Sequence, residues 1–88
     1  MLDYENKFLI VFKSYNQAML LFSELKKEKC NVNLISTPCG ISKGCSHSIV
    51  FDIDDTKTVI DAIKNNNIKS ISIYKIVKKN NKINYIPI

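Results

Sequence analysis

Hydrophobic positions near the start of the chain form first a continuous run and then a helical spacing. Lys7–Lys13 reads Lys-Phe-Leu-Ile-Val-Phe-Lys, and an apolar run bounded by charge is typical of a strand buried on both faces at the centre of a sheet. Ser14 and Gln17 then fit a capping box. The apolar residues that follow recur at the spacing of one helix face, and they are Ala18, Leu21, Phe22 and Leu25. The pattern predicts a central strand followed by a helix.

The middle of the chain predicts two more strands and a second helix. Val32–Ser36 is a short apolar segment, and Ser48–Ile53 alternates apolar and polar positions as a half-buried strand does. Asp54 or Asp55 can cap the second helix, whose apolar positions are Val59, Ile60, Ala62 and Ile63. The run Asn65-Asn66-Asn67 is expected to end it, because asparagine tolerates the left-handed conformation that often stops a helix.

The last third of the chain predicts a hairpin. Lys69–Lys79 alternates again, Asn80-Asn81 can turn the chain back, and Ile83–Ile88 can add an edge strand in which Pro87 is tolerated. The whole order predicts an α+β fold of the ferredoxin-like βαββαβ kind with a C-terminal hairpin or edge-strand arm. Because 88 residues can close only one core, we expect residues 1–88 to form a single domain.

The alternation in the strands assigns apolar residues to both faces of the sheet. The face that the helices cover is expected to carry Phe8, Ile10, Phe12, Ile49, Phe51 and Ile53. The face without helices is expected to carry Leu9, Val11, Val50, Tyr74 and Ile76. An open apolar face of this size indicates an interface. We therefore expect either the C-terminal arm or a second copy of the protein, in a homodimer, to cover it.

Composition and charge narrow the function classes. With 45% hydrophobic and 24% charged residues the chain is an ordinary globular one. No apolar stretch is long enough for a membrane span, and the first residues lack the pattern of a secretion signal, so we expect a cytoplasmic protein that has no membrane partner. The net charge of +5 comes from dispersed lysines, which favours a solvated basic surface over a nucleic-acid partner. RNA binding is further disfavoured because the open face lacks the stacking aromatics of RNA-recognition domains.

The candidate functional segment is the loop Thr37–His47. It holds both glycines, two of the three cysteines and the only histidine of the chain. Small and special residues of this kind suit a tight bend that presents backbone N–H groups to a bound or reacting atom. The expected site residues are Cys39 and Cys45 as reactive groups, and Thr37, Ser42, Lys43, Gly44, Ser46 and His47 as binding groups.

Cys45 is the candidate reactive residue. Lys43 and His47 flank it, and nearby cations and backbone donors favour the nucleophilic thiolate. Such a thiolate can accept sulfur as a persulfide or be oxidised reversibly. A cysteine that serves as a small hydrophobe at a strand start is the other interpretation, and residue chemistry alone leaves both open. Cys30, among lysines at the end of the first helix, is interpreted as structural or incidental.

The stretch Thr37-Pro38-x-x-Ile41-Ser42-x-x-Cys45 resembles the motif of the small selenium/sulfur carrier-like domains, a family of unknown function, and the resemblance covers most of the chain. It implies a carrier role, with Cys45 holding sulfur or selenium that a donor protein supplies and an acceptor protein receives. Two positions depart from that motif: Cys39 stands where the family usually has arginine, and Ser46 where it usually has glycine. Cys39 can serve as a resolving thiol for Cys45, provided that the geometry allows it.

Other functions have weaker support in the residues. Cys39, Cys45 and His47 could meet on one bent loop, but four-ligand zinc spacing is missing, so no metal is expected. Enzyme signatures such as a phosphate loop or a Ser-His-Asp set are missing too, which favours a carrier without a cofactor over a turnover enzyme. The alternative is an interaction module that binds a small anion or a protein through the Thr37–His47 loop.

Overall fold

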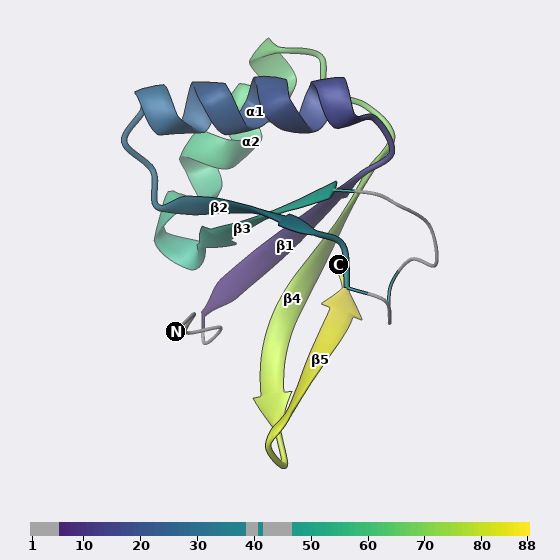
Figure 1. Ribbon diagram of the computed structural model, residues 1–88. Helices are drawn as coiled ribbons and strands as arrows, with labels where there is room; N and C mark the ends of the chain where they lie inside the picture. The colour runs from purple at the N-terminus through teal and green to yellow at the C-terminus, as the bar shows by residue number, and fades with distance from the viewer. Residues whose placement is uncertain (1–5, 39–40, 42–46) are drawn as a thin grey trace.

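Two helices lie on one face of a five-stranded antiparallel sheet in the computed structural model of the protein, which describes residues 6–38, 41 and 47–88 (Figure 1). The elements are β1 (Lys7–Phe12), α1 (Tyr15–Lys27), β2 (Val32–Ser36), β3 (His47–Asp52), a 3-10 turn η1 (Ile53–Asp55), α2 (Thr56–Asn65), β4 (Ile71–Lys79) and β5 (Lys82–Pro87). The strand order is β2-β3-β1-β4-β5. The predicted α+β class is therefore confirmed, and β1 is central, as its continuous apolar run predicted. Neither described helix is long and apolar enough to cross a membrane.

The main core lies between the helices and the sheet. In β1, Ile10 and Phe12 are buried on this side, and in β3 Ile49 and Phe51 are buried opposite them. From the helices, the residues Ala18, Leu21, Leu25 and Val59 complete the cluster. The predicted helix-covered face is thus confirmed except at Ile53. That side chain is 45% exposed, because the chain leaves the sheet after Asp52 and Ile53 begins the 3-10 turn.

Both helices end in the same way. Lys29, with φ of 62°, follows α1, and its N–H donates to Lys26 O while the N–H of Cys30 donates to Leu25 O over 3.0 Å. After α2, Asn67 has a φ of 52°, and the N–H of Ile68 donates to Ile63 O. These paired bonds define Schellman motifs. The asparagine run therefore ends α2 as predicted, whereas α1 reaches the same geometry with a lysine.

The helix starts differ from each other. Ser14 caps α1 as predicted, and its hydroxyl accepts from the N–H of Gln17 over 3.3 Å. Asp55 occupies the N-cap position of α2, but its side chain makes no capping hydrogen bond. Its carboxylate instead accepts from the backbone N–H of Asn31 over 3.4 Å. The predicted N-cap position is therefore confirmed at Asp55, but its carboxylate ties the residue before β2 to the start of α2 and makes no capping hydrogen bond.

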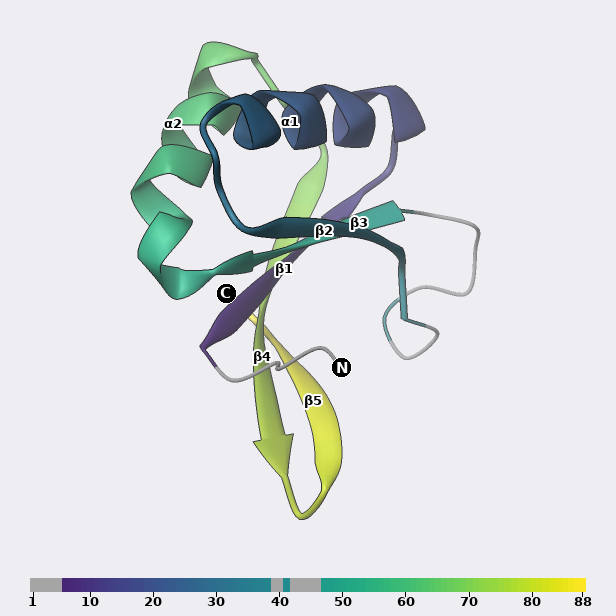
Figure 2. The ribbon, with the colours of Figure 1, turned by 60° about the vertical axis from the view of Figure 1, so that its left-hand side comes forward.

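The sheet face away from the helices is covered from within the chain. Leu9, Val50 and Ile76 are almost fully buried there, and Tyr85 of β5 and Ile41 of the Thr37–His47 loop pack against them. Figure 2 shows the β4–β5 hairpin extending away from the helices on this side. Of the two predicted covers for this face, the structure thus contains the C-terminal arm.

A tight turn joins the two strands of the hairpin. Asn80 and Asn81 have φ values of 54° and 62°, and the flanking residues Lys79 and Lys82 are paired. Positive φ at both central residues is the requirement of a type I′ turn, whose twist matches that of the strands. The predicted reversal at Asn80-Asn81 is confirmed. The strand after it is Lys82–Pro87, one residue earlier at each end than expected.

Candidate functional site at the base of the Thr37–His47 loop

The loop joins β2 to β3, which are antiparallel neighbours in the sheet. Of its predicted site residues, the structure describes Thr37 and His47, one at each end, together with Pro38 and Ile41 of the motif. The other predicted site residues lie outside the described part of the chain, and they are Cys39, Ser42, Lys43, Gly44, Cys45 and Ser46. The site can therefore be built from the two ends of the loop and from Ile41, which the structure describes between them.

The two ends of the loop are joined by a buried hydroxyl pair. Thr37 Oγ1 lies 2.7 Å from Ser48 Oγ, and either oxygen can be the donor. The two side chains are 8% and 0% exposed, and they are the buried polar residues of the described structure. Thr37 directly follows Ser36, the last paired residue of β2, whereas Ser48 still pairs with Ile35, so the hydroxyl bond runs diagonally across the loop end of the ladder. It closes the base of the loop where backbone pairing stops.

Ile41 anchors the inside of the loop to the sheet. Its N–H donates to Pro38 O over 3.0 Å, which closes a turn directly after Thr37. Its side chain packs against the cluster of Leu9, Val50 and Ile76. The side chain of Ile41 therefore ties the loop to the face that the helices leave open.

A groove lies where Ile41 approaches the hairpin. It has a volume of about 610 Å³ and is lined by Ile41, Tyr74, Ile83, Asn84, Tyr85 and Pro87. The lining residues are isoleucines, tyrosines, a proline and an asparagine, and they come from the loop, β4 and β5. The loop and the C-terminal hairpin thus share one surface.

The far end of the loop lies beside the start of α1. The ring of His47, the first residue of β3, contacts the ring of Tyr15, the first residue of α1, edge to face with 4.6 Å between the ring centroids. Ser14, the cap of α1, directly precedes Tyr15. His47, at the C-terminal end of the loop, therefore lies beside the first residue of α1, where the helix dipole is positive.

Cys30 is a core residue rather than a site residue. It is 7% exposed and unpaired, and it follows α1 at the position where a Schellman motif places its apolar contact. Burial raises the pKa of its thiol, and the nearby carboxylates of Asp55 and Glu28 raise it further. A raised pKa disfavours the thiolate, so the structural interpretation of Cys30 fits this environment.

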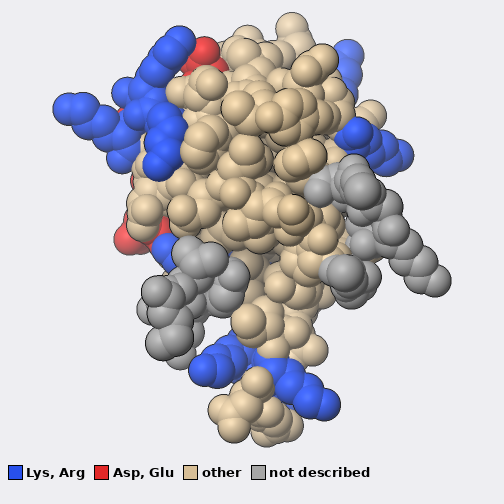
Figure 3. All heavy atoms as spheres, in the orientation of Figure 1, with Lys and Arg blue, Asp and Glu red and all other residues tan. Residues whose placement is uncertain are grey.

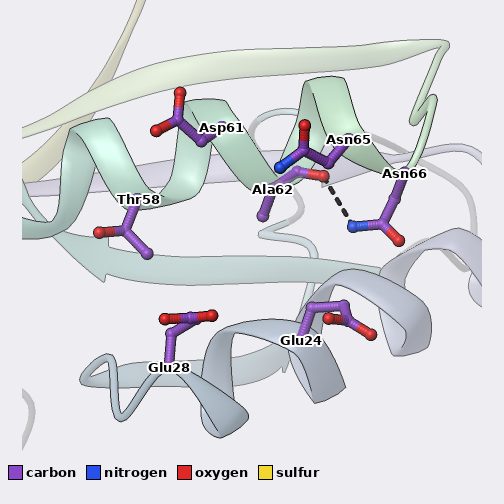
Figure 4. A pocket seen from close by; sticks show the side chains of 7 residues that line it. All are labelled: Glu24, Glu28, Thr58, Asp61, Ala62, Asn65 and Asn66. Carbon is purple, nitrogen blue, oxygen red and sulfur yellow. Dashed lines mark hydrogen bonds between the residues drawn. The ribbon is translucent and has the colours of Figure 1, made fainter.

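A second groove lies between α1 and α2 (Figure 4). It is lined by Glu24, Glu28, Thr58, Asp61, Ala62, Asn65 and Asn66. The Asn66 amide points back along α2 and donates to Ala62 O over 2.9 Å, so it serves the helix end. Among the described residues, no group of three metal-ligating side chains is brought together here or elsewhere. None of the lining residues belongs to the Thr37–His47 loop.

Sequence reasoning missed the residues that hold the loop. By alternation Ser48 shares a sheet face with Val50, and a serine on the same face as a buried valine is a signal that its hydroxyl needs a partner. Ile41 was part of the motif, but its isolated apolar character inside a polar loop indicated an anchor. The contact of Tyr15 with His47 had no signal, because it depends on how α1 lies against β3.

Comparison with known families places most of this chain in one of them. Residues 7–75 match the model of a family described as Putative Se/S carrier protein-like, where Se/S stands for selenium or sulfur. The match includes the whole loop and ends within β4. No curated protein matches the chain.

Proposed function

The chain belongs to the Se/S carrier protein-like family, and from this premise we propose that it is a small cytoplasmic thiol carrier that accepts sulfur or selenium on Cys45. It exchanges this cargo with donor and acceptor proteins, and it needs neither a cofactor nor a metal. The strand order β2-β3-β1-β4, with a helix after β1 and after β3, supports a single ferredoxin-like domain over residues 1–88 with the β5 strand added at one edge.

The observation that carries this proposal is the base of the loop. The hydroxyl pair of Thr37 and Ser48 holds the two loop ends together, and His47 contacts Tyr15 at the start of α1. Cys45 precedes His47 by two residues, and two residues of chain span at most about 7 Å. The chain itself thus keeps the Cα atom of Cys45 within this distance of the Cα atom of His47, and a protonated imidazole or a helix N-terminus close to a thiol favours the thiolate.

The transfer step itself is an exchange of sulfane sulfur. The Cys45 thiolate attacks the outer sulfur of a donor persulfide, the donor S–S bond breaks, and the donor leaves as a thiolate. An acceptor thiolate takes the sulfur from Cys45 in the same way. Cys39, at a position where the family usually has arginine, offers a second route: its thiolate attacks the inner sulfur of the Cys45 persulfide and releases hydrosulfide. That route leaves a Cys39–Cys45 disulfide, which a cellular dithiol must reduce.

The test is site-resolved mass spectrometry after treatment with glutathione persulfide at pH 7. We expect a mass increase of one sulfur atom on the peptide that contains Cys45, and none on the peptide that contains the buried Cys30. The Cys45→Ser variant should take up no sulfur, whereas Cys30→Ala should load like the natural protein. Equal modification of Cys30 and Cys45, or an unmodified Cys45, would exclude the carrier role.

The groove beside Ile41 favours a second candidate function. A non-enzymatic module that binds a protein or a small anion through the loop would use this groove and the loop backbone rather than the thiol. The two functions separate in the Cys45→Ser variant. Carriage is lost in that variant, whereas binding by an interaction module persists.

A further inference from the structure

The lysines are dispersed along the chain, but the acidic residues are not, so the net positive charge lies at the C-terminal end. Residues 62–88 contain six lysines and no aspartate or glutamate. Since the chain has 13 basic and 8 acidic residues, residues 1–61 hold 7 and 8 of them and carry a net charge of −1. The whole excess of positive charge therefore belongs to the segment that forms the end of α2, β4 and β5.

The lysines of the hairpin have no acidic partner among the described residues. We call residues 76–88 the arm, which contains Lys78, Lys79 and Lys82, all exposed. The ion pairs that the described residues form are Lys7 with Asp52 and Lys27 with Glu24. Figure 3 shows lysines without acidic residues around the hairpin end of the molecule. Exposed charge of one sign attracts a partner of the opposite sign.

The arm also exposes apolar side chains on an edge strand. Ile83, Ile86 and Ile88 are 40%, 49% and 76% exposed. In the described sheet, β5 has a neighbour on one side only. An edge strand that carries exposed isoleucines can pair with an added strand, and its side chains then provide the specificity.

One face of the arm continues into the groove beside the loop. Ile83, Tyr85 and Pro87 alternate along β5 and line the groove together with Ile41. A segment added to β5 therefore lies beside the groove that Ile41, the described anchor of the Thr37–His47 loop, also lines. The arm lies beyond residues 7–75, the part of the chain that matches the family.

From these observations we infer that the arm is the docking site for an extended, acidic segment of the protein that exchanges sulfur or selenium with Cys45. The segment adds a strand to the edge of β5, its carboxylates pair with Lys78, Lys79 and Lys82, and its apolar side chains contact the exposed isoleucines. The identity of the partner rests on the proposed function. The docking surface itself rests on the charge and exposure of the arm.

A second copy of the chain fits this edge less well than an acidic segment. Two arms paired along β5 bring only Lys82 of each copy into the shared ladder, since Lys78 and Lys79 lie in β4, and neither arm offers an acidic residue to these lysines. The positive charge of both arms then stays uncompensated, and like charge on two surfaces opposes their association. An acidic segment neutralises the same charges.

The docking surface is tested with a fluorescein-labelled peptide of alternating glutamate and valine, seven residues long. Fluorescence anisotropy should show binding that weakens with salt and drops by about tenfold or more in the triple variant Lys78→Glu, Lys79→Glu, Lys82→Glu. The matched variant Lys57→Glu, Lys64→Glu, Lys69→Glu makes the same charge change outside the arm and should bind within about twofold of the natural protein. Equal binding by both variants overturns the inference.

Two further measurements decide between the possible occupants. Analytical sedimentation of the natural protein should give a monomer. If the natural protein is a dimer and the triple lysine variant of the arm is a monomer, the inference is overturned in favour of a second copy. A single-stranded RNA oligonucleotide of equal charge should bind more weakly than the peptide, and tighter binding of the RNA overturns it as well.

The link to carriage is tested with the same peptide extended by a C-terminal cysteine persulfide. Docking raises the effective concentration of the donor sulfur. We expect this peptide to load Cys45 about tenfold or more faster than free cysteine persulfide does, and the arm variant to lose the advantage while free cysteine persulfide still loads it normally. If neither donor loads Cys45 of the natural protein, the proposed function is contradicted, whereas the peptide-binding result is unaffected. Normal loading without any advantage for the peptide contradicts the docking inference alone.

Discussion

Thr37 Oγ1 and Ser48 Oγ lie 2.7 Å apart in the interior, at the point where β2 and β3 separate into the Thr37–His47 loop. The bond joins two residues that are 11 positions apart in the sequence. It therefore fixes the distance between the two ends of the segment that contains Cys45. A buried hydroxyl pair needs both partners, because either one left alone is an unsatisfied polar group.

Removing one hydroxyl of the pair should destabilise the protein. We expect Thr37→Val or Ser48→Ala to lower the free energy of unfolding by about 1–3 kcal/mol, because the remaining hydroxyl stays buried without its partner. The double variant should lose less than the sum of the two. Urea denaturation measures these values, and Ser72→Ala on the exposed side of β4 is the control that should change little. Additive losses in the double variant would show that the two hydroxyls act independently.

The Lys7–Asp52 ion pair should make the free energy of unfolding depend on pH. The ammonium of Lys7, which donates a hydrogen bond to Asp52, holds the pKa of this carboxyl below the ordinary value of 3.8, and the Asn31 amide lowers it further. In the unfolded chain the carboxyl takes up its proton first as the pH falls. The ion pair therefore stabilises the folded protein at pH values above the ordinary pKa of Asp52. This stabilisation is lost as the pH falls through the lower pKa that Asp52 has in the folded protein.

The measurement is urea denaturation of the natural protein and of Asp52→Asn at pH 7 and at pH 3. We expect the variant to be less stable at pH 7, and we expect the difference to shrink at pH 3. Asp61→Asn, on the exposed side of α2, is the control. An Asp52→Asn difference that is the same at both pH values would contradict the role of the ion pair.

Cys30 should resist alkylation in the folded protein. Its burial raises the pKa of the thiol, so the reactive thiolate is scarce at pH 7 and is also hard to reach. Iodoacetamide followed by peptide mass spectrometry should show slow modification of Cys30 in buffer and fast modification in urea. Replacing it by serine should cost about 1–2 kcal/mol, because a hydroxyl then occupies the apolar end of a Schellman motif. Fast alkylation under native conditions would contradict the packing of this residue.

The type I′ turn should accept glycine better than alanine. Asn81 has a φ of 62°, a conformation that glycine adopts without steric cost and alanine does not. We expect Asn81→Gly to be neutral or to stabilise the protein by up to about 1 kcal/mol, and Asn81→Ala to destabilise it by about 1 kcal/mol. Thermal unfolding followed by circular dichroism measures both. Asn84→Ala, within β5, is the comparison at a residue without positive φ.

Local sequence patterns determined most of the secondary structure of this protein. The continuous run in β1, the helical spacing from Ala18 to Leu25 and the asparagine pairs that stop or turn the chain each contain their physical cause within a few neighbouring residues. The assignment of Leu9 and Val50 to the open sheet face also followed from alternation alone. The loop composition and the Cys45 motif pointed to the family that the chain belongs to.

Only the tertiary structure decided how these elements act on one another. The Thr37–Ser48 bond, the approach of Tyr15 to His47 and the packing of Tyr85 and Ile41 under the sheet each join residues from different elements. Asp55 shows the same limit, because its carboxylate serves Asn31 of a distant segment rather than its own helix. Sequence patterns report local preference and the side on which a residue is buried, whereas a specific partner is chosen only when the elements pack.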